Sequence, residues 1–243
     1  MHSLDKKWII DRYNARYAQH GVSNLGTLAN GSPEREALRY STIMEIGIAP
    51  GDSVLDVGCG NGKFLKHLEG KQFSACGIDR SATMVERACA LGVDASTKEL
   101  DAFSEASFEC VVAIADVLNY TPVTEVDSFF EAVARVLPKN GYFVCDINTL
   151  YGFEGVAEGV MCQDKESQFL CVEATFENKE LLTKIVLFEK ECDFYRKEEG
   201  LITQYFHPLS FFKKLKMFKL CSTKPITLFG DEPDKTILVF QKR

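Results

Sequence analysis

Apolar runs and amphipathic segments alternate through residues 53–147 of the 243-residue chain. Short apolar runs indicate buried strands, whereas apolar residues spaced three or four apart indicate one face of a helix. Strands that alternate with helices predict a parallel, doubly wound α/β sheet. The expected strands are 53–57, 72–78, 93–95, 108–115 and 142–147, and the expected helices are 62–68, 81–91 and 123–137.

The pattern changes after Asn148, where strand-like runs follow one another without an intervening helix. Apolar and polar residues alternate along these runs, and turn residues stand at Asn178-Lys179 and Glu199-Gly200. The alternation predicts an antiparallel sheet over 168–206. A last helix is expected over 208–219, with an aromatic and leucine face, before two final strands at 221–229 and 235–242.

Two further helices are expected before the first strand. Residues 4–20 carry apolar and aromatic side chains at helical spacing, and Ser32-Pro33-Glu34 has the cap, proline and early acid of a helix start. The predicted organisation is an N-terminal helical cap at 1–47, a core at 48–150 and 207–243, and an inserted antiparallel β subdomain at 151–206.

A glycine-rich turn follows the first predicted strand directly. In Val54-Leu55-Asp56-Val57-Gly58-Cys59-Gly60-Asn61-Gly62-Lys63-Phe64 the apolar run gives way to alternating glycines, and a helical pattern resumes at once. Such glycines let the backbone approach a ligand closely, and the following helix directs free N–H groups at the same place. Because the Asp56 carboxylate disfavours a phosphate, the segment predicts a cationic or zwitterionic cofactor with a ribose, which points to S-adenosylmethionine.

The second predicted strand ends at Asp79, about 20 residues after the turn, where a carboxylate can accept hydrogen bonds from ribose hydroxyls. The nearest alternative is the dinucleotide fingerprint G-x-G-x-x-G, but Gly58, Gly60 and Gly62 have the spacing G-x-G-x-G. Ser81 is expected to cap the next helix. A tight turn without a ligand would have the same glycines, and the combination with the two aspartates favours a cofactor site.

The segments DVGCGNG and GIDRSATMVERA resemble the first two motifs of the class I S-adenosylmethionine-dependent methyltransferases. The resemblance continues through FECVVAIADVLNY, the helix ending ARVLP and the strand GYFVCDIN, and so covers about residues 40–150. It implies a seven-stranded Rossmann-like sheet, and the pattern ADVLNY followed by DIN is most similar to members that methylate small molecules. The insertion at 151–206 is then expected to be a lid that binds the acceptor.

The resemblance also implies which residues bind S-adenosylmethionine. Asp56 and the glycines are expected to hold the methionine portion, Asp79 the ribose, and Met84 to lie beside the adenine. Many members have Gly-Asp after the third strand, whereas this chain has Ser96-Thr97-Lys98, which leaves the adenine contact to a hydroxyl or a backbone N–H. The expected cofactor-binding residues are Tyr17, Asp56, Val57, Gly58, Cys59, Gly60, Asn61, Asp79, Arg80, Met84, Thr97, Lys98, Ala115 and Asp116.

Polar residues at the ends of the fourth and fifth predicted strands are candidates for the acceptor site, because ligands of doubly wound sheets bind outside the carboxyl ends of strands. In one interpretation they bind a polar or cationic acceptor, and in the other they cap the following loops. The expected catalytic residues are Asp116, Asn119, Tyr120 and His207, and the expected substrate-binding residues are Tyr13, Asn119, Asp146 and Asn148.

Methyl transfer from a sulfonium is an in-line displacement that depends on alignment and on a dry site. A carboxylate or His207 would accept the proton of an amine acceptor, with a structural role as the alternative for the histidine. Tyr13 and Tyr17, one helical turn apart, or Tyr120 would face the sulfonium by cation–π attraction. Packing against the domain is the alternative role for these aromatic rings.

The net charge of −7 disfavours a nucleic-acid partner, whose binding rests on neutralising phosphates. The polar N-terminus and the lack of a long apolar run predict a cytoplasmic protein without a membrane partner, acting on a small molecule as a monomer or homodimer. The nine cysteines are scattered and form no C-x-x-C pair, so we expect reduced, mostly buried cysteines and no metal site.

Three functions remain open from the sequence. The first is S-adenosylmethionine-dependent transfer of a methyl group to a nitrogen or oxygen of a small molecule. The second is a protein or RNA methyltransferase, which the acidic charge and the lack of a basic arm disfavour. The third is a noncatalytic module that binds S-adenosylmethionine. The identity of the acceptor is not specified by these patterns.

Overall fold

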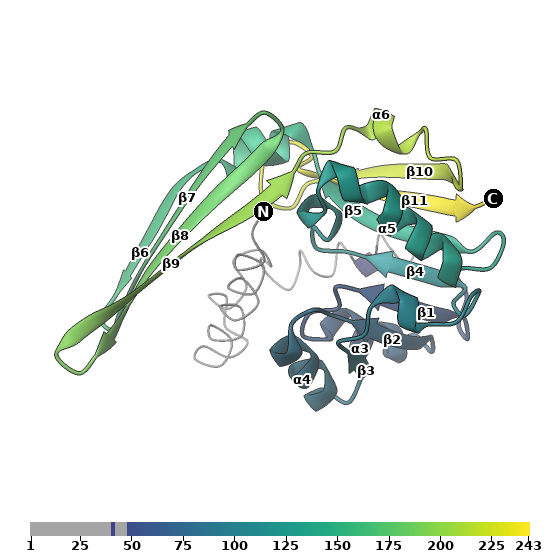
Figure 1. Ribbon diagram of the computed structural model, residues 1–243, viewed down its shortest axis with the longest axis horizontal. Coiled ribbons are helices and arrows are strands. Elements are labelled where there is room, and N and C mark those ends of the chain that lie inside the picture. Colours follow the sequence, from purple (N-terminus) through teal and green to yellow (C-terminus); the bar gives the residue numbers. More distant parts are fainter. Residues whose placement is uncertain (1–39, 42–47) are drawn as a thin grey trace.

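The computed structural model describes residues 40–41 and 48–243, so the helices expected at 4–20 and through most of 33–46 lie outside the described residues. The described chain forms a seven-stranded sheet, here called sheet A, and a four-stranded sheet, here called sheet B. Sheet B projects from one side of the core as a long, narrow extension (Figure 1).

Sheet A has the order β10-β11-β5-β4-β1-β2-β3. Strands β1 to β5 run parallel to one another, whereas β11 runs antiparallel to both β5 and β10. The predicted doubly wound, seven-stranded sheet is confirmed. Its strands are β1 (Ser53–Val57), β2 (Ser74–Ile78), β3 (Asp94–Ser96), β4 (Cys110–Ala113), β5 (Tyr142–Asn148), β10 (Phe218–Ile226) and β11 (Lys235–Lys242).

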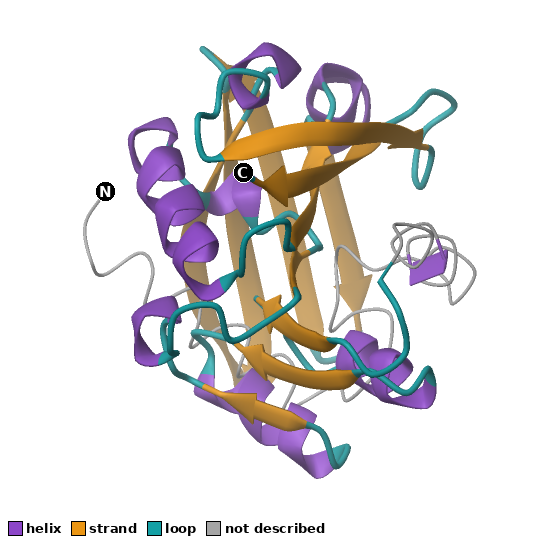
Figure 2. Cartoon of the chain, turned by 90° about the vertical axis from the view of Figure 1, so that its right-hand side faces the viewer, coloured by secondary structure: helices purple, strands orange, loops and turns teal. Residues whose placement is uncertain are grey.

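Helices lie on both sides of sheet A (Figure 2). The Ser81 hydroxyl caps α4 by accepting a hydrogen bond from the Met84 N–H at 3.3 Å, as the sequence predicts. The helices are α3 (Lys63–Gly70), α4 (Ala82–Ala90), α5 (Val123–Val136) and α6 (Leu209–Phe212), with short helices η1 (Leu100–Ala102), η2 (Leu118–Tyr120) and η3 (Gly152–Ala157).

Two apolar layers cover the two faces of sheet A, because successive side chains along each strand point to opposite faces. One layer joins the sheet to α5 and α6, and the other joins it to α3. An aromatic cluster fills the first layer. The ring of Phe130 lies 5.2 Å from those of Phe143 and Phe240 and 5.6 Å from that of Phe218, edge to face in each case.

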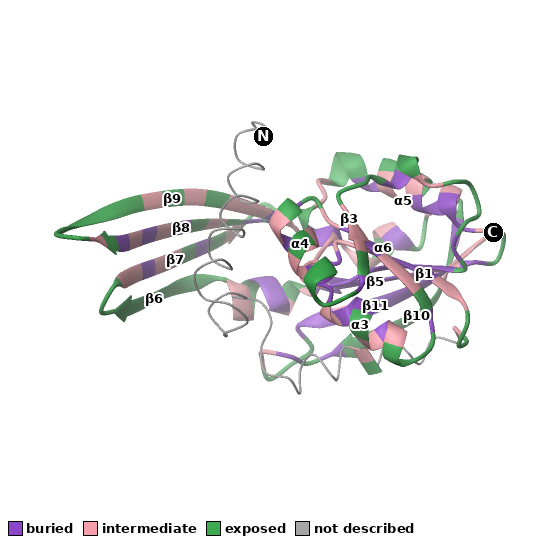
Figure 3. Cartoon of the chain, turned by 90° about the horizontal axis from the view of Figure 1, so that it is seen from below, coloured by how far each residue is buried: buried purple, intermediate pink, exposed green. Residues whose placement is uncertain are grey.

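Sheet B confirms the predicted antiparallel insertion. Its strands are β6 (Gly159–Lys165), β7 (Gln168–Glu177), β8 (Glu180–Glu191) and β9 (Phe194–Tyr205). Buried residues lie mainly on the inner strands β7 and β8, whereas β6 is exposed along its whole length (Figure 3). Asn178 and Lys179 both have positive φ between β7 and β8, as expected for a two-residue hairpin turn.

Two details of the sheet B prediction were wrong. The turn expected at Glu199-Gly200 lies inside β9, where Gly200 pairs with Ile185, and the actual turn is at Cys192-Asp193. Strand β6 was not predicted, because all of its residues are exposed and it has no buried face to produce an apolar alternation.

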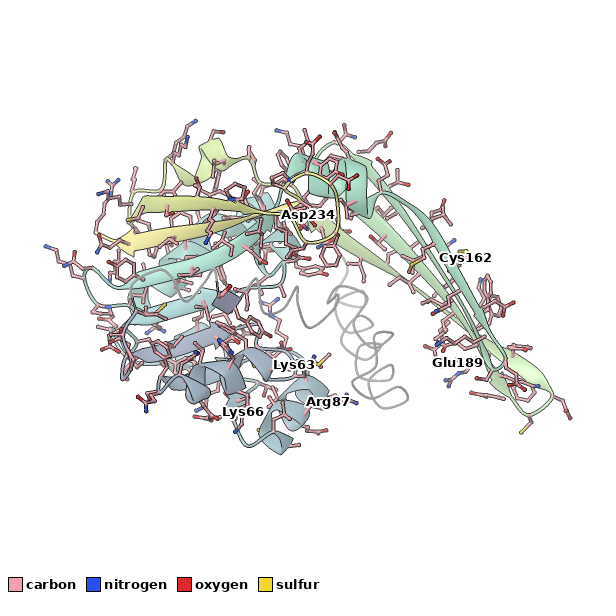
Figure 4. All side chains as sticks on the ribbon, turned by 180° about the vertical axis from the view of Figure 1, so that it is seen from behind. Lys63, Lys66, Arg87, Cys162, Glu189 and Asp234 are labelled. Carbon is pink, nitrogen blue, oxygen red and sulfur yellow. A yellow bond between two sulfur atoms is a disulfide. The ribbon has the colours of Figure 1, made fainter. Side chains whose placement is uncertain are left out.

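The expectation that all cysteines are reduced was also wrong. Cys162 and Cys171 stand directly opposite each other on β6 and β7 and form a disulfide (Figure 4). Their pairing depends on the unpredicted strand β6, so the sequence pattern did not reveal it. The expected burial holds for Cys59, Cys110 and Cys145, and the remaining cysteines are partly or fully exposed.

The last helix is shorter than predicted. Helix α6 ends at Phe212, and Phe218 and Lys219 belong to β10 instead of to a helix over 208–219. Phe218 keeps the burial that the helical pattern implied, but it packs into the aromatic cluster from a strand that pairs with β11. The backbone partners that β11 offers therefore override the local helical spacing.

Replacing Phe130 with alanine should remove the centre of the aromatic cluster and lower the free energy of unfolding by about 3–5 kcal/mol. Denaturant titration followed by circular dichroism measures the change. The control is Phe194→Ala, because Phe194 is 60% exposed and its removal should cost less than about 1 kcal/mol. Equal losses for the two variants would contradict the assigned core.

Candidate functional site

The carboxyl ends of β1, β2, β4 and β5 lie along one edge of sheet A, because these strands are parallel. The chain leaves β5 at this edge, passes through η3 and enters sheet B (Figure 1). Loops at this edge of a doubly wound sheet are where its ligands bind. The candidate site is therefore built from the residues that end these strands.

The turn after β1 is held against β2 by backbone hydrogen bonds. The N–H groups of Gly58 and Cys59 both donate to the Ile78 carbonyl oxygen, at 2.8 and 3.1 Å. The Cys59 side chain lies buried beneath the turn beside Gly77, where a Cβ would come within 2.6 Å of the cysteine Cβ. Gly77, which sequence reasoning did not single out, is therefore needed because a side chain there would displace Cys59 and the turn from β2.

Two glycines of the turn serve different purposes, although both have positive φ, 54° at Gly60 and 78° at Gly62. A Cβ on Gly62 would lie 2.8 Å from side-chain atoms of Ala88 and Val93. A Cβ on Gly60 would have no atom of the described residues 40–41 and 48–243 within 4 Å. Gly62 is thus required by the packing beneath the turn, whereas Gly60 borders open space on the ligand side.

Asp79 follows β2 and ties the turn to the next helix. Its carboxylate accepts hydrogen bonds from the Gly60 N–H at 2.9 Å and from the Ser81 N–H at 2.8 Å. Burial raises the pKa of this carboxyl, and the two backbone hydrogen bonds act in the opposite direction. Asp79 therefore shapes the glycine turn, in addition to the ribose contact that remains a prediction.

Asp56 is a buried carboxylate without a hydrogen-bond partner. It is 1% exposed, and neither of its oxygens has a partner among the described residues. Burial, together with the negative charge of Asp79, raises its pKa to about 8. A carboxyl of this kind is stabilised when a cation approaches. The ammonium group of a methionine portion is such a cation, so Asp56 and the open side of Gly60 fit S-adenosylmethionine.

The residues after β4 form a strained turn. Ala115 and Asp116 have φ values of 65° and 72°, and a left-handed conformation costs about 1–2 kcal/mol for such residues. The Asp116 N–H donates to Asp146 Oδ1 at 3.1 Å, and its carboxylate forms an ion pair with Lys235. These contacts from β5 and β11 hold the strained turn in place.

This turn also touches the glycine turn. A Cβ on Gly58 would lie 2.6 Å from the Val117 side chain, so the two turns are packed against each other. Any group that binds at the glycine turn is therefore next to the segment that begins with Ala115 and Asp116.

Lys235 is a site residue that sequence reasoning missed. It is the first residue of β11 and only 3% exposed, and its ammonium donates to Asn148 Oδ1 at 2.6 Å as well as to Asp116. In the sequence it follows the polar loop Gly230–Asp234 and has the appearance of a solvent-exposed lysine. Its only sequence signal is its position at the start of an apolar strand, and pairing with β5 brings it to the site.

Asn119 connects the two sheets. Its side-chain oxygen accepts the Asn148 N–H at 2.9 Å, and its side-chain nitrogen donates to the Tyr205 carbonyl oxygen at 2.9 Å. The His207 Nε2 lies 2.9 Å from the Leu118 carbonyl oxygen, and burial lowers the pKa of this histidine. Both side chains thus hold η2 in position, between the end of β5 and the end of β9.

The other predicted residues are distributed around this edge. Tyr120 is 40% exposed, Met84 is buried, and Arg80 forms an ion pair with Glu99 at 3.6 Å on the surface. Thr97 and Lys98 are exposed after β3, Val57 and Asn61 are partly buried in the glycine turn, and Asp146 is fully buried at the end of β5. Tyr13 and Tyr17 lie outside the described residues.

Within residues 40–41 and 48–243, no helix has the length and apolar character needed to cross a membrane. In the same part of the chain, no three or more histidine, cysteine, aspartate or glutamate side chains form a group that would hold a metal ion.

Among solved structures, an S-adenosylmethionine-dependent methyltransferase from Clostridium acetobutylicum is similar to this chain, with a TM-score of 0.72 at 18% identity, over 96% of this chain and 99% of that one. The sugar N-methyltransferase KedS8 from Streptoalloteichus has a TM-score of 0.67 at 18% identity, over 95% and 92% of the two chains. The fold is therefore that of the class I S-adenosylmethionine-dependent methyltransferases.

Residues 54–141 match the family model of the methyltransferase domain. A putative methyltransferase of Geobacillus is 27% identical over 125 residues, which are 47% of this chain and 50% of the relative. The chain spans about half the length of the curated relatives it matches. Residues 54–141 thus form a methyltransferase domain, and with the class I fold this confirms the resemblance drawn from the sequence.

The two glycines provide a matched pair of substitutions. Gly60→Ala should cost about 1–2 kcal/mol of stability for its left-handed backbone and should weaken S-adenosylmethionine binding at least about tenfold, because the methyl group enters the ligand's space. Gly62→Ala should destabilise the fold more, because its Cβ meets Ala88 and Val93. Denaturant titration and calorimetry measure the two effects. Unchanged cofactor affinity in Gly60→Ala would contradict the position of the site.

Asp56→Asn should change how stability depends on pH. The pKa of Asp56 is about 8 in the folded chain against an ordinary value of 3.8, so folding takes up a proton between these pH values. The stability of the wild-type protein without cofactor should therefore fall relative to the variant as pH rises from about 4 to 8, by several kcal/mol at about 1.4 kcal/mol per pKa unit.

Denaturant titrations across this pH range test the effect, with the exposed Asp101→Asn as the control. If wild type and Asp56→Asn kept a constant difference across the range, Asp56 would not be protonated on folding.

Proposed function

We propose that this protein transfers a methyl group from S-adenosylmethionine to a nitrogen or oxygen of a small-molecule acceptor. The observation that carries the proposal is the buried Asp56 carboxyl group, which has no hydrogen-bond partner among the described residues, at the strand end that leads into the open glycine turn. Burying a carboxyl group without a partner costs free energy, and a turn with only a structural role does not need one. A site that binds the ammonium group of a ligand does need such a group.

Different residues at the edge of sheet A would bind different parts of S-adenosylmethionine. Asp56 would hold the ammonium group of the methionine portion, and Gly60 would allow its close approach. Asp79 would accept from the ribose with the lone pairs that the Gly60 and Ser81 N–H groups leave free. When bound, S-adenosylmethionine supplies the electrophilic methyl group, and the protein's task is alignment and exclusion of water.

The acceptor would lie between the end of β4 and sheet B. Tyr120, the half-exposed residue of η2, is the candidate for contact with the acceptor or the sulfonium. His207 is buried and bonded to the Leu118 carbonyl, so we assign it the placement of η2 in preference to proton transfer. The insertion at 151–206 would serve as the acceptor-binding lid, because segments that cover a site on a rigid scaffold commonly determine which substrate binds.

The similarity to the sugar N-methyltransferase KedS8 makes amino sugars the first acceptor class to test. An amine must be neutral to attack a methyl group, so the protein or water must take its proton. Phenols and other hydroxyl compounds form the second class. The acidic net charge of −7 favours such small molecules over nucleic acid.

Asp79→Asn should weaken S-adenosylmethionine binding at least about tenfold, since hydrogen bonds to a charged group contribute about 1.5–3 kcal/mol each. Isothermal calorimetry with S-adenosylmethionine and S-adenosylhomocysteine measures the change. Asp94→Asn is the matched control, because Asp94 is exposed on the neighbouring strand β3. Wild-type affinity in Asp79→Asn would remove this carboxylate from the cofactor site.

Activity requires a second assay, in which labelled methyl groups are counted after incubation with pooled amino sugars, amines and phenols. Transfer to one of these pools supports the proposed reaction. Transfer only to protein or RNA would replace it with a macromolecular methyltransferase. Cofactor binding with no transfer to any pool would favour a noncatalytic module.

A further inference from the structure

The ion pair between Lys235 and Asp116 has no part in the binding roles assigned above. The side chains of these residues are only 4% and 13% exposed. Burying an ion pair costs desolvation of both charges, and its net contribution to stability is often small. A role in the site is therefore worth considering for the lysine.

The position of Asp116 places its charge in the turn that packs against the glycine turn. It belongs to the left-handed turn after β4, and the next residue, Val117, packs against Gly58 of the glycine turn. On the proposed function, S-adenosylmethionine held at the glycine turn would bring its sulfonium near this junction of the two turns. The Asp116 carboxylate is thus within the range at which an incompletely screened charge acts.

An uncompensated carboxylate here would hinder the reaction. The sulfur loses its positive charge as the methyl group departs, so a negative charge near the sulfur stabilises the reactant more than the transition state. Only interactions that are stronger in the transition state accelerate the chemical step. The Asp79 carboxyl group already lies at this edge of the sheet, so an uncompensated charge on Asp116 would add to an unfavourable field.

Lys235 counteracts this field while it holds the turn. Its ammonium contacts the Asp116 carboxylate, and a second hydrogen bond of 2.6 Å to Asn148 Oδ1 fixes the ammonium at the end of β5. Asp146 faces the same turn from β5 and accepts the Asp116 N–H. The lysine is therefore the cation that β11 supplies to a group of carboxylates from β4 and β5.

We propose that Lys235 is a positioning residue of the transfer site, whose buried ammonium fixes Asp116 in its left-handed turn and offsets its negative charge at the cofactor sulfur. This inference rests on the proposed function. It assigns to this lysine a role in setting the relative affinity for S-adenosylmethionine, which carries a sulfonium, and S-adenosylhomocysteine, which has a neutral sulfur.

The test is the ratio of the two dissociation constants, Kd for S-adenosylhomocysteine divided by Kd for S-adenosylmethionine, measured by calorimetry at one pH. Lys235→Met keeps most of the side-chain volume and should raise the ratio at least about fivefold, because it exposes the sulfonium to the full charge of Asp116. Asp116→Asn leaves the lysine uncompensated and should lower the ratio. The double variant should return to within about twofold of wild type.

The matched control is Lys242→Met, at the other end of β11, where the ammonium donates to the Leu137 carbonyl oxygen. This variant should leave the ratio unchanged. A merely structural role of Lys235 would shift both dissociation constants by the same factor, and an unchanged ratio in Lys235→Met would overturn the inference.

If Lys235→Met does not fold, Asp116→Asn and the double variant decide the matter. An unchanged ratio in Asp116→Asn, or a double variant that keeps the shift of Asp116→Asn, would overturn the proposal. If the wild-type protein binds neither ligand, the proposed function is overturned together with the role of Lys235. If the wild-type protein binds both ligands but the ratio does not change in the variants, only the role of Lys235 is overturned.

Discussion

The contact between the end of β1 and the end of β2 determines the geometry of the whole cofactor edge. Two N–H groups of the glycine turn share the Ile78 carbonyl oxygen, and the Asp79 carboxylate accepts a third N–H from Gly60. Because the turn is tied to β2 at three points, its glycines take up left-handed conformations that a free loop would leave. The neighbouring turn after β4 then packs on it through Val117.

This arrangement gathers carboxyl groups where water is scarce. Asp56 has no hydrogen-bond partner within the part of the chain that the structure describes, and its raised pKa reflects the free energy that its ionisation costs in the absence of a cation. Asp116, one strand away, has a lysine as its partner. The two carboxyl groups thus differ in their partners. Asp56 can pair with a positive charge on a ligand, whereas Asp116 is paired with a lysine of the protein itself.

The sequence predicted the parts of the fold whose pattern is local. Strand β1, the Ser81 cap and the placement of Asp79 follow from apolar runs and turn chemistry within a few residues. The failures depend on long-range pairing. Strand β6 has no buried face and hence no pattern, and its disulfide was hidden with it. Lys235 lies in the site only because β11 pairs with β5, and no residue near Lys235 in the sequence predicts that pairing.

Strand β11 lies between β5 and β10, although it follows both in the sequence. During synthesis, which proceeds from the N-terminus, the glycine turn is therefore made long before the strand that carries Lys235. A nascent chain interrupted before that strand would contain all of the motif residues but would leave the edge of β5 unpaired, and open edges of this kind associate with other chains. The completeness of the site thus depends on some of the last-translated residues of sheet A, far in sequence from the segment by which the domain is recognised.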